Sequence, residues 1–300
     1  MQEIDAKNPR RAMAFGLATV LCWSTVATAF KLTLRELDPP QLLLYAAVFS
    51  TASLLALLAV QGRWRLFVTA LTQHPWRSLG LGTINPLVYY LVLFEAYDRL
   101  PAQVAQPVNY TWAITLSLLA AVFLKQRLRG KDMAAAAVAY AGVVLLSMQG
   151  EWGSWGRVDG LGLALALLST LIWSGYWIAA ASDRRDPVAA LAANFCMSLP
   201  GCLIACLVLS SPLDVSWQGV AGAAYIGCLE MGLTFALWVT ALRLAPSAAQ
   251  VSTLIFLSPP ISLVLIHFLL GETIHASTFA GLALVLAGLG LQQFGRKSTS

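Results

Sequence analysis

Apolar residues along the chain gather in ten runs, each close to the length of a helix that crosses a membrane. A hydrocarbon core of roughly 30 Å needs about 20 predominantly apolar residues in helical form. The runs cover residues 12–31, 40–60, 78–97, 102–124, 132–149, 160–181, 187–209, 218–241, 247–269 and 276–294. Only short polar segments separate them. The pattern therefore predicts an all-α polytopic membrane protein with ten transmembrane helices.

Two stretches of the chain, 97–128 and 242–272, resemble each other. Each begins with a turn, continues as an apolar run of helix length, and ends in a short segment that leaves the helix, here called the exit. Pro101 falls on Pro246 and Phe123 on Phe268, which is a shift of 145 residues. The agreement predicts a duplicated unit, with repeats at residues 1–149 and 150–300. Because five spans are an odd number, the second repeat starts on the opposite side of the membrane. The repeats are therefore expected to be inverted, the arrangement of many secondary transporters, with a central cavity between them.

Composition and charge placement agree with a membrane protein. The chain is 58% hydrophobic and 11% charged, which is unusual for a soluble domain. With the N-terminus inside, fifteen Lys and Arg residues fall in inside segments and only four outside. This asymmetry predicts a multi-pass protein of a bacterial-type cytoplasmic (inner) membrane with both termini cytoplasmic. The net charge of +5 thus reflects topology and gives no indication of a nucleic-acid partner. The four outside residues are Lys31, Arg35, Arg99 and Arg157.

An alternative interpretation of the N-terminus is a cleaved signal peptide, because Ala27-Thr28-Ala29 resembles a cleavage site. Cleavage there would leave nine spans and disturb the charge asymmetry. The five cysteines all lie in predicted spans without CxxC spacing, so we interpret them as small apolar residues. No metal site, cofactor or catalytic group is predicted.

Polar and aromatic residues inside the spans are the candidates for substrate contact, since such groups in a bilayer must face protein or water. A Trp-Ser pair occurs in the first span and again in the sixth. The fourth span carries a polar stripe at helical spacing. The candidate substrate-binding residues are Trp23, Ser24, Asn85, Tyr89, Tyr90, Gln106, Asn109, Tyr110, Trp112, Trp173, Tyr176, Trp177 and Glu230. Each could instead serve helix packing, and the amides could join helices.

Prolines predict interruptions within three spans. Asn85-Pro86 predicts a kink in the third span, Pro200-Gly201 a break in the seventh, and Pro259-Pro260 a break in the ninth. The fifth and tenth spans are rich in Ala and Gly, which is typical of close helix packing. Trp64 and Trp76 bracket a cytoplasmic loop and are typical of the interfacial belt.

The ten spans, the half-chain repeat, the two Trp-Ser pairs and the exit Phe268-Leu269-Leu270-Gly271-Glu272 resemble the drug/metabolite transporter superfamily, EamA type. Within it the chain is most similar to YddG-type exporters of aromatic and other neutral amino acids. The resemblance implies a ten-helix exporter with a central cavity between the halves. The first half departs from the family's Gly-Glu exit, having Lys125-Gln126 there, so no role of that glutamate carries over.

Three classes of function follow. The favoured one is a secondary transporter that exports small neutral or zwitterionic metabolites, amino acids including aromatic ones, by alternating access. Alternatives are an exporter of other metabolites or drugs, or a carrier of phosphorylated or nucleotide-linked solutes, which needs Lys or Arg at membrane depth. An intramembrane enzyme is disfavoured because no HExxH or GxSxG motif occurs.

Glu230 is the one acidic residue near the middle of a predicted span. A charged carboxylate is costly there, so we expect it to be protonated. It could couple export to protons, or it could be a neutral acid between helices or an acceptor for a substrate ammonium group. The partners expected are therefore the lipid bilayer and a small-molecule substrate, with the coupling ion and the oligomeric state left open.

Overall fold

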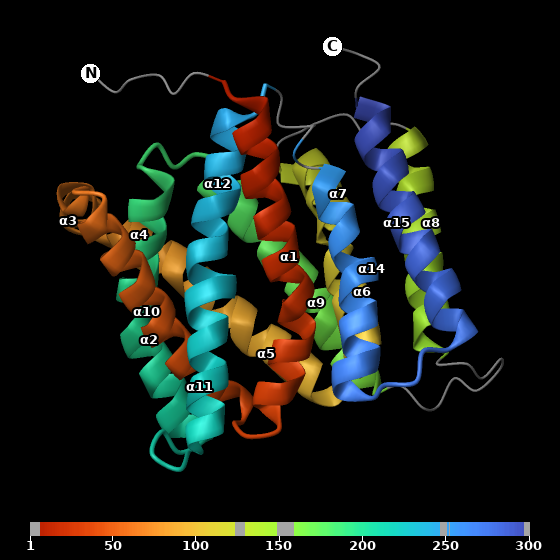
Figure 1. Ribbon diagram of the computed structural model, residues 1–300, viewed down its shortest axis with the longest axis horizontal. Helices are drawn as coiled ribbons and strands as arrows, with labels where there is room; N and C mark the ends of the chain where they lie inside the picture. Colours follow the sequence, from red (N-terminus) through yellow and green to blue (C-terminus); the bar gives the residue numbers. More distant parts are fainter. Residues whose placement is uncertain (1–6, 124–129, 149–158, 247–250, 252, 297–300) are drawn as a thin grey trace. The chain divides into compact units, whose positions relative to one another are not determined.

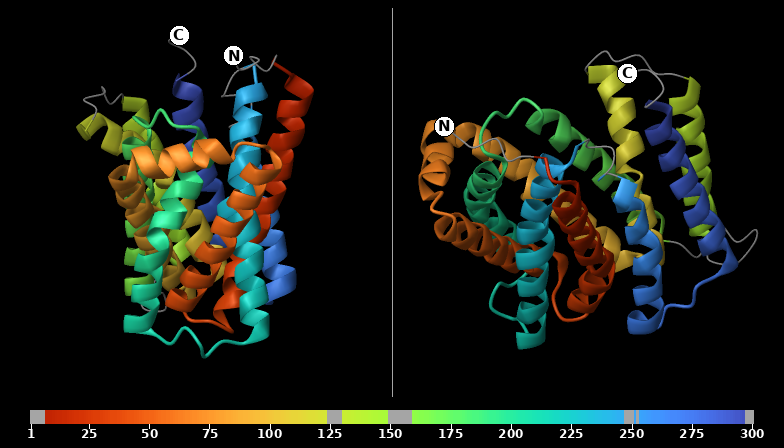
Figure 2. Two further views of the ribbon diagram at one scale, coloured as in Figure 1. Left: turned by 90° about the vertical axis from the view of Figure 1, so that its left-hand side faces the viewer. Right: turned by 45° about the horizontal axis from the view of Figure 1, so that its top comes forward.

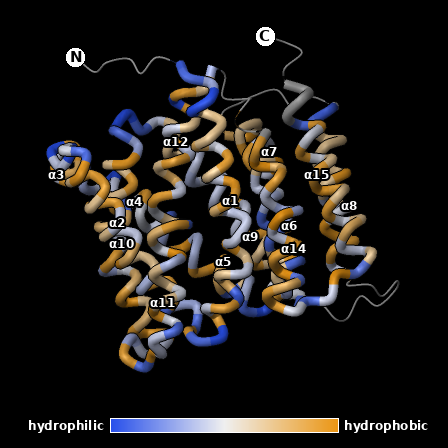
Figure 3. Tube along the Cα trace, viewed as in Figure 1, coloured by the Kyte–Doolittle hydropathy of each residue, from blue (hydrophilic) through white to orange (hydrophobic). Residues whose placement is uncertain are grey.

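The computed structural model describes residues 7–123, 130–148, 159–246, 251 and 253–296, and in this part of the chain it contains helices and no strand (Figure 1). Hydrophilic residues concentrate at the helix ends and hydrophobic residues along the helices (Figure 3). The segments 124–129 and 149–158, with the predicted cytoplasmic exit of the fourth span and an outside loop, lie outside the described residues.

Seven helical stretches are long and apolar enough to cross a membrane: Pro9–Leu34, Pro39–Val60, Pro75–Arg99, Gly130–Ser147, Gly160–Ala180, Pro187–Leu209 and Trp217–Leu244. Two shorter apolar stretches, Leu254–Leu270 and Ala276–Gln292, correspond to the predicted ninth and tenth spans. The predicted fourth span is divided into α6 (Ala102–Tyr110) and α7 (Trp112–Phe123), which meet at Thr111. The class of a multi-pass helical membrane protein is thus confirmed.

The described chain forms two compact units, and each takes segments from both halves of the sequence. Unit 1 comprises Met1–Leu87 and Arg184–Leu265, and unit 2 comprises Val88–Asp183 and Ile266–Ser300. In chain order, unit 1 contains α1 (Pro9–Leu34), α2 (Pro39–Val60), α3 (Trp64–Gln73), α4 (Pro75–Gly82), α10 (Pro187–Leu209), α11 (Trp217–Tyr225), η2 (Ile226–Leu233), α12 (Thr234–Leu244), η3 (Thr253–Leu257) and α14 (Ser258–Leu265). Unit 2 contains α5 (Tyr89–Arg99), α6, α7, α8 (Gly130–Ser147), α9 (Gly160–Ala180), η4 (Ile266–Leu270) and α15 (Ala276–Arg296); η1 (Thr83–Val88) spans the boundary.

In unit 1, α1 lies antiparallel to the helical stretch formed by α11, η2 and α12. The backbone N–H of Asn8 donates to the carbonyl of Leu244 at 3.0 Å, and at the other end Gly222 packs directly against Thr33. Helix α2 packs along α10 and η2, where Gly227 lies against the backbone of Ala46. Close approach at glycines of this kind supplies much of the van der Waals contact that holds membrane helices together.

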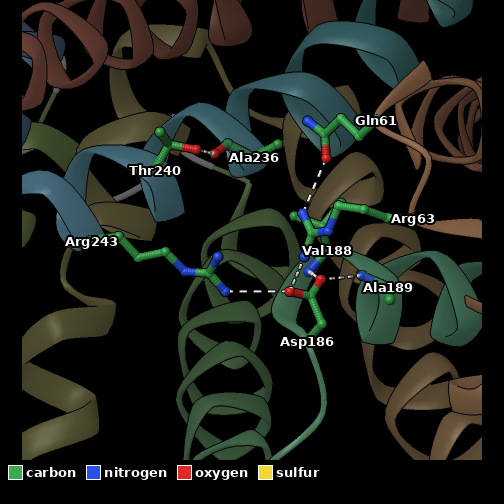
Figure 4. Close-up of polar contacts among 8 residues, drawn as sticks. All are labelled: Gln61, Arg63, Asp186, Val188, Ala189, Ala236, Thr240 and Arg243. Atoms are coloured by element: carbon green, nitrogen blue, oxygen red, sulfur yellow. Dashed lines mark hydrogen bonds and ion pairs between the residues drawn. The ribbon is translucent and has the colours of Figure 1, made fainter. Parts of the chain in front are cut away.

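At one end of unit 1, Asp186 connects three segments of the chain (Figure 4). Its carboxylate forms ion pairs with Arg63, which precedes α3, and with Arg243 of α12, the second at 3.3 Å. It also accepts hydrogen bonds from the backbone N–H groups of Val188 and Ala189 at 3.2 and 3.1 Å, and so caps α10. With only 10% of its side chain exposed, the carboxylate is well placed to hold three segments together.

At the opposite end of unit 1, Asp38 occupies the equivalent capping position on α2. It forms a capping box with Gln41 and accepts a hydrogen bond from Ser210. Both caps are followed by a proline at the first helical position, Pro39 and Pro187, a combination that favours helix initiation. Asp186 is thus paired with two arginines, whereas Asp38 is held by Gln41 and Ser210.

In unit 2, α8 and α15 lie antiparallel over their length. A Cβ placed on Gly142 would meet the carbonyl oxygen of Gly281 at 2.6 Å, and one placed on Gly288 would meet that of Ala135 at 2.6 Å. Helix α9 packs against α5, α6 and α7. The Ala- and Gly-rich character of the fifth and tenth spans thus reflects backbone contact between them.

The structure confirms one proline prediction and corrects another. At Asn85-Pro86 the helix is interrupted, with Asn85 at φ −140° and ψ 114°. The ninth span changes from the 3₁₀ helix η3 to α14 just before Pro259-Pro260. The predicted break at Pro200-Gly201 is wrong, because α10 continues through it. A Cβ on Gly201 would lie 2.8 Å from Leu87, so this glycine provides close packing and no hinge.

We predict that Gly142→Ala destabilises the protein by about 1–3 kcal/mol, because the added methyl group meets backbone that cannot rotate away. Gly80→Ala is the matched control, since nothing lies within 4 Å of a Cβ at that position in α4. Unfolding in detergent, followed by circular dichroism, measures both. Equal stability of the two variants would contradict the close α8–α15 crossing.

Candidate functional site

Unit 2 contains a continuous cluster of aromatic side chains centred on Trp173 of α9. Tyr89 stacks on Trp173 with ring centroids 4.5 Å apart and an interplanar angle of 28°, and Tyr176 stacks on it at 5.5 Å. Trp112 and Trp177 approach edge-on at 6.4 and 5.8 Å. Offset stacked and edge-to-face pairs are the favoured geometries of aromatic rings. The structure thus groups five of the candidate residues, and Tyr90 joins them through Tyr89 at 4.8 Å.

A polar network lies beside this cluster. The side-chain amide of Asn109 donates to Ser169 Oγ at 2.9 Å and to the Tyr89 hydroxyl at 3.4 Å. Ser174 Oγ donates to the carbonyl oxygen of Trp112 at 2.9 Å. The hydroxyl groups therefore connect α9 to α5, α6 and α7, as expected where a bilayer offers no other partner.

The network extends further than the sequence analysis predicted. Thr115 Oγ1 lies 3.1 Å from both Thr170 Oγ1 and the Tyr140 hydroxyl. Neither threonine nor Tyr140 was a candidate. The available signal was the hydroxyl stripe of α9, in which Ser169, Thr170 and Ser174 follow helical spacing.

Tyr89 is the residue that belongs to both arrangements. Its ring stacks on Trp173 and its hydroxyl accepts from Asn109. The helices that carry most of the site, α6, α7 and α9, contain no charged residue. The site thus brings buried aromatic rings next to neutral hydrogen-bonding groups, with Tyr89 and Tyr176 only 5% and 4% exposed. Of the remaining fourth-span candidates, Gln106 is buried one turn before Asn109 and Tyr110 is half-buried.

The other four candidates belong to unit 1. Trp23 packs against Trp238 of α12, with ring centroids 5.3 Å apart, and Ser24 donates to the carbonyl oxygen of Val20 at 2.7 Å. Asn8 contacts Leu244 at one end of α1, and Thr33 contacts Gly222 at the other. Because the two segments are antiparallel, counting residues inward from these contacts places Glu230 at about the same depth as Ser24. Glu230 therefore lies near the middle of its helical stretch.

Asn85 and Glu230 occupy matching positions in the two halves of the sequence. They are 145 residues apart, the shift that relates Pro101 to Pro246. Both positions are irregular, because Asn85 lies at the interruption before Pro86, whereas Glu230 lies in the π-helical segment η2. Such wide turns are uncommon and frequently occur at functional sites. Neither the correspondence nor the wide turn at Glu230 was apparent from hydrophobicity alone.

Glu272 is a functional candidate that the sequence analysis left without a role. Its two carboxylate oxygens accept hydrogen bonds from the backbone N–H groups of Ala102 at 2.8 Å and Gln103 at 3.1 Å. These are the first residues of α6, where Pro101 provides no side-chain cap. A carboxylate at this point also interacts favourably with the helix dipole. Glu272 thus fixes the start of the helix that carries Asn109.

Neighbouring contacts explain why this exit is Gly-Glu. Gly271 adopts φ +70°, a left-handed conformation that glycine adopts with little strain. Gln103 then donates to the carbonyl oxygen of Thr273 at 3.0 Å and accepts from Thr278 Oγ1 at 2.9 Å. Nearby, Asp159 caps α9, and the backbone hydrogen bond from Gly162, assisted by Leu161 and Arg99, lowers the pKa of its carboxyl.

The fold is that of a multi-pass helical membrane protein. The sequence pattern of the EamA-like transporter family matches residues 10–148 and again residues 160–292. The chain therefore belongs to the EamA-like transporter family.

Individual relatives are more distant. The chain is 27% identical to the aromatic amino acid exporter YddG of Ancylobacter novellus over 76% of this chain and 78% of that protein. It is 27% identical to protein PecM of Dickeya dadantii over 71% and 72%. A solved crystal structure matches 98% of this chain and all of its own chain with a TM-score of 0.69 at 20% identity, which indicates a shared fold.

We predict that Glu272→Ala destabilises the protein by about 0.5–2 kcal/mol, the usual cost of losing an N-terminal helix cap. Glu272→Gln should cost less, because one acceptor oxygen remains. The matched control is Glu95→Gln, which removes an exposed i,i+4 ion pair with Arg99 and should change little. If Glu272→Ala unfolds at the same denaturant concentration as the control, the capping role is wrong.

Proposed function

We propose that the protein is a secondary transporter that exports small neutral or zwitterionic metabolites by alternating access, with amino acids, including aromatic ones, as substrates. The observation that carries this proposal is the double role of Tyr89, which joins a stack of aromatic rings to the amide of Asn109. Aromatic side chains gain contact area and stacking from such a surface. The relation to an aromatic amino acid exporter supports the same substrate class.

The absence of charge at the site disfavours the runner-up, a carrier of phosphorylated or nucleotide-linked solutes. Phosphate is usually bound by Arg or Lys. Helices α6, α7 and α9 have neither. A zwitterion needs no fixed charge, because hydroxyls, amides and the ends of interrupted helices can bind its two groups. Tyr110 and Trp112 flank Thr111, where α6 ends and α7 begins.

Contacts in unit 2 support two inverted repeats with boundaries at residues 1–149 and 150–300. Gly142 contacts Gly281, and Gly288 contacts Ala135. The second pair follows from the first when 146 is added to position 142 and subtracted from position 281. A two-fold relation between repeats produces such reciprocal pairs. The fifth and tenth spans also lie antiparallel, as inversion requires. In unit 1, α2 and α10 are antiparallel too, since Gln41 contacts the carbonyl of Ser211.

The charged ends of unit 1 support cytoplasmic termini in a bacterial-type inner membrane. Arg63, Arg184 and Arg243 share one end with Asp186, whereas Glu36 and Asp38 lie at the other end with Arg35. In a background without native cysteines, an impermeant thiol reagent added outside should label Asp214→Cys and leave Arg184→Cys unmodified. Labelling of Arg184→Cys alone would reverse the orientation.

Trp173→Ala tests the substrate class. It removes the centre of the aromatic cluster, so transport of Phe and Trp into liposomes should weaken about two- to twelvefold relative to Ala, corresponding to stacking of about 0.5–1.5 kcal/mol. The matched control is Trp217→Ala, whose side chain is 76% exposed at the end of α11. An equal loss for all amino acids would indicate a folding defect and argue against an aromatic binding surface.

Glu230→Gln tests proton coupling, which we propose for this residue because it lies mid-helix in the wide turn η2. The amide preserves shape but cannot exchange a proton. Accumulation driven by a pH gradient should therefore disappear while substrate counterflow persists. Asn85→Asp is the reciprocal variant, because it introduces a carboxyl group at the matching position of the first half. A Glu230→Gln protein that still accumulates substrate would exclude this residue as the coupling group.

A further inference from the structure

We propose that α3 is an interfacial helix that docks on the anionic phospholipid surface at the basic end of unit 1. The sequence analysis predicted a loop between Trp64 and Trp76. The structure has instead a ten-residue helix, Trp64–Gln73, after a turn at Gly62 with φ +66°. Figures 1 and 2 show α3 running across α10, whereas α2 runs along it. A helix that crosses the ends of membrane-spanning helices lies near the membrane surface.

The buried side of α3 is fixed to unit 1. Phe67 and Ala70 are 6% and 3% exposed, and α3 contacts α10, α2 and α4. The guanidinium of Arg185 donates to the carbonyl oxygen of Ala70 at 3.3 Å and to Ser78 Oγ at 2.5 Å. These contacts determine which faces of the helix remain outward.

Two outward faces differ in chemistry. Trp64 and Val68 are one turn apart on one face and are 47% and 40% exposed. Arg65, Thr69 and Gln73 follow the same helical spacing on another face and are exposed. An apolar face next to a polar face is the pattern of helices that lie in the headgroup region of a bilayer. Trp76, 81% exposed just after α3, is typical of the interfacial belt.

The basic residues at this end of unit 1 favour an anionic partner. Asp186 is engaged by Arg63 and Arg243 and is largely buried, and Asp183, which directly precedes Arg184 in the sequence, is half-buried. Five basic side chains around Asp186 are exposed, and they are Lys7, Arg10, Arg11, Arg65 and Arg184. Basic residues near a membrane surface are attracted to anionic lipid headgroups by about 1 kcal/mol each. The apolar face would enter the bilayer, and Arg65 would contact the phosphates.

The position of α3 can be measured with the full-length protein in nanodiscs of phosphatidylcholine mixed equally with phosphatidylglycerol. An environment-sensitive fluorophore is attached to Val68→Cys or Thr69→Cys in a background without native cysteines. We expect blue-shifted emission and protection from aqueous iodide at position 68 but not at position 69. Iodide access to position 68 equal to that at position 69 would overturn the proposal and leave this face for another partner.

The anionic preference needs a second readout. Energy transfer from the fluorophore at position 69 to headgroup-labelled phosphatidylglycerol, relative to labelled phosphatidylcholine, reports enrichment beside α3. Arg65→Gln should reduce this enrichment about fivefold, the equivalent of about 1 kcal/mol. Arg35→Gln, an exposed arginine at the opposite end of unit 1, is the control and should leave it unchanged. Equal effects of the two variants, with both proteins folded, would refute the role of Arg65.

Discussion

Hydrocarbon provides no hydrogen-bond partner, so polar groups within the membrane-spanning part of this chain must find partners in the protein. This constraint explains why the polar residues of unit 2 occur as a network. Asn109 binds Ser169 and Tyr89, and Ser174 binds a carbonyl of α7. The same constraint acts at helix ends, where Glu272 caps α6 across 170 residues of sequence. A substrate that binds beside this network can use hydrogen-bonding groups that are already held in place.

Much of the helix pattern follows from the sequence. Long apolar runs give the spans, and Asp-Pro pairs give the starts of α2 and α10. The interruption at Asn85 was predicted because proline removes a backbone donor. The same rule failed at Pro200, since a membrane helix can tolerate one lost donor when close packing compensates, as at Gly201 against Leu87. Hydrophobicity also missed α3, which is amphipathic and shorter than a span.

The site could be predicted only in part. Helical spacing placed Trp173, Tyr176 and Trp177 on one face, and the structure confirms that their rings meet. The contact of Tyr89 with both Trp173 and Asn109 depends on three helices packing together, and no local pattern reports that. The roles of Thr115, Thr170 and Glu272 were missed for the same reason. Asn85 and Glu230 show how the repeat helps, because they occupy matching positions and each lies where the regular α-helix is interrupted or widened.

The central claim is that an uncharged aromatic and amide site selects neutral amino acids over anionic solutes. The most direct test is the thermal unfolding of the purified protein with added ligand, because a ligand that binds the native state raises the unfolding temperature. We predict that phenylalanine and tryptophan raise it more than alanine does, and that a nucleotide sugar leaves it unchanged. Stabilisation by the nucleotide sugar without stabilisation by any amino acid would contradict this account.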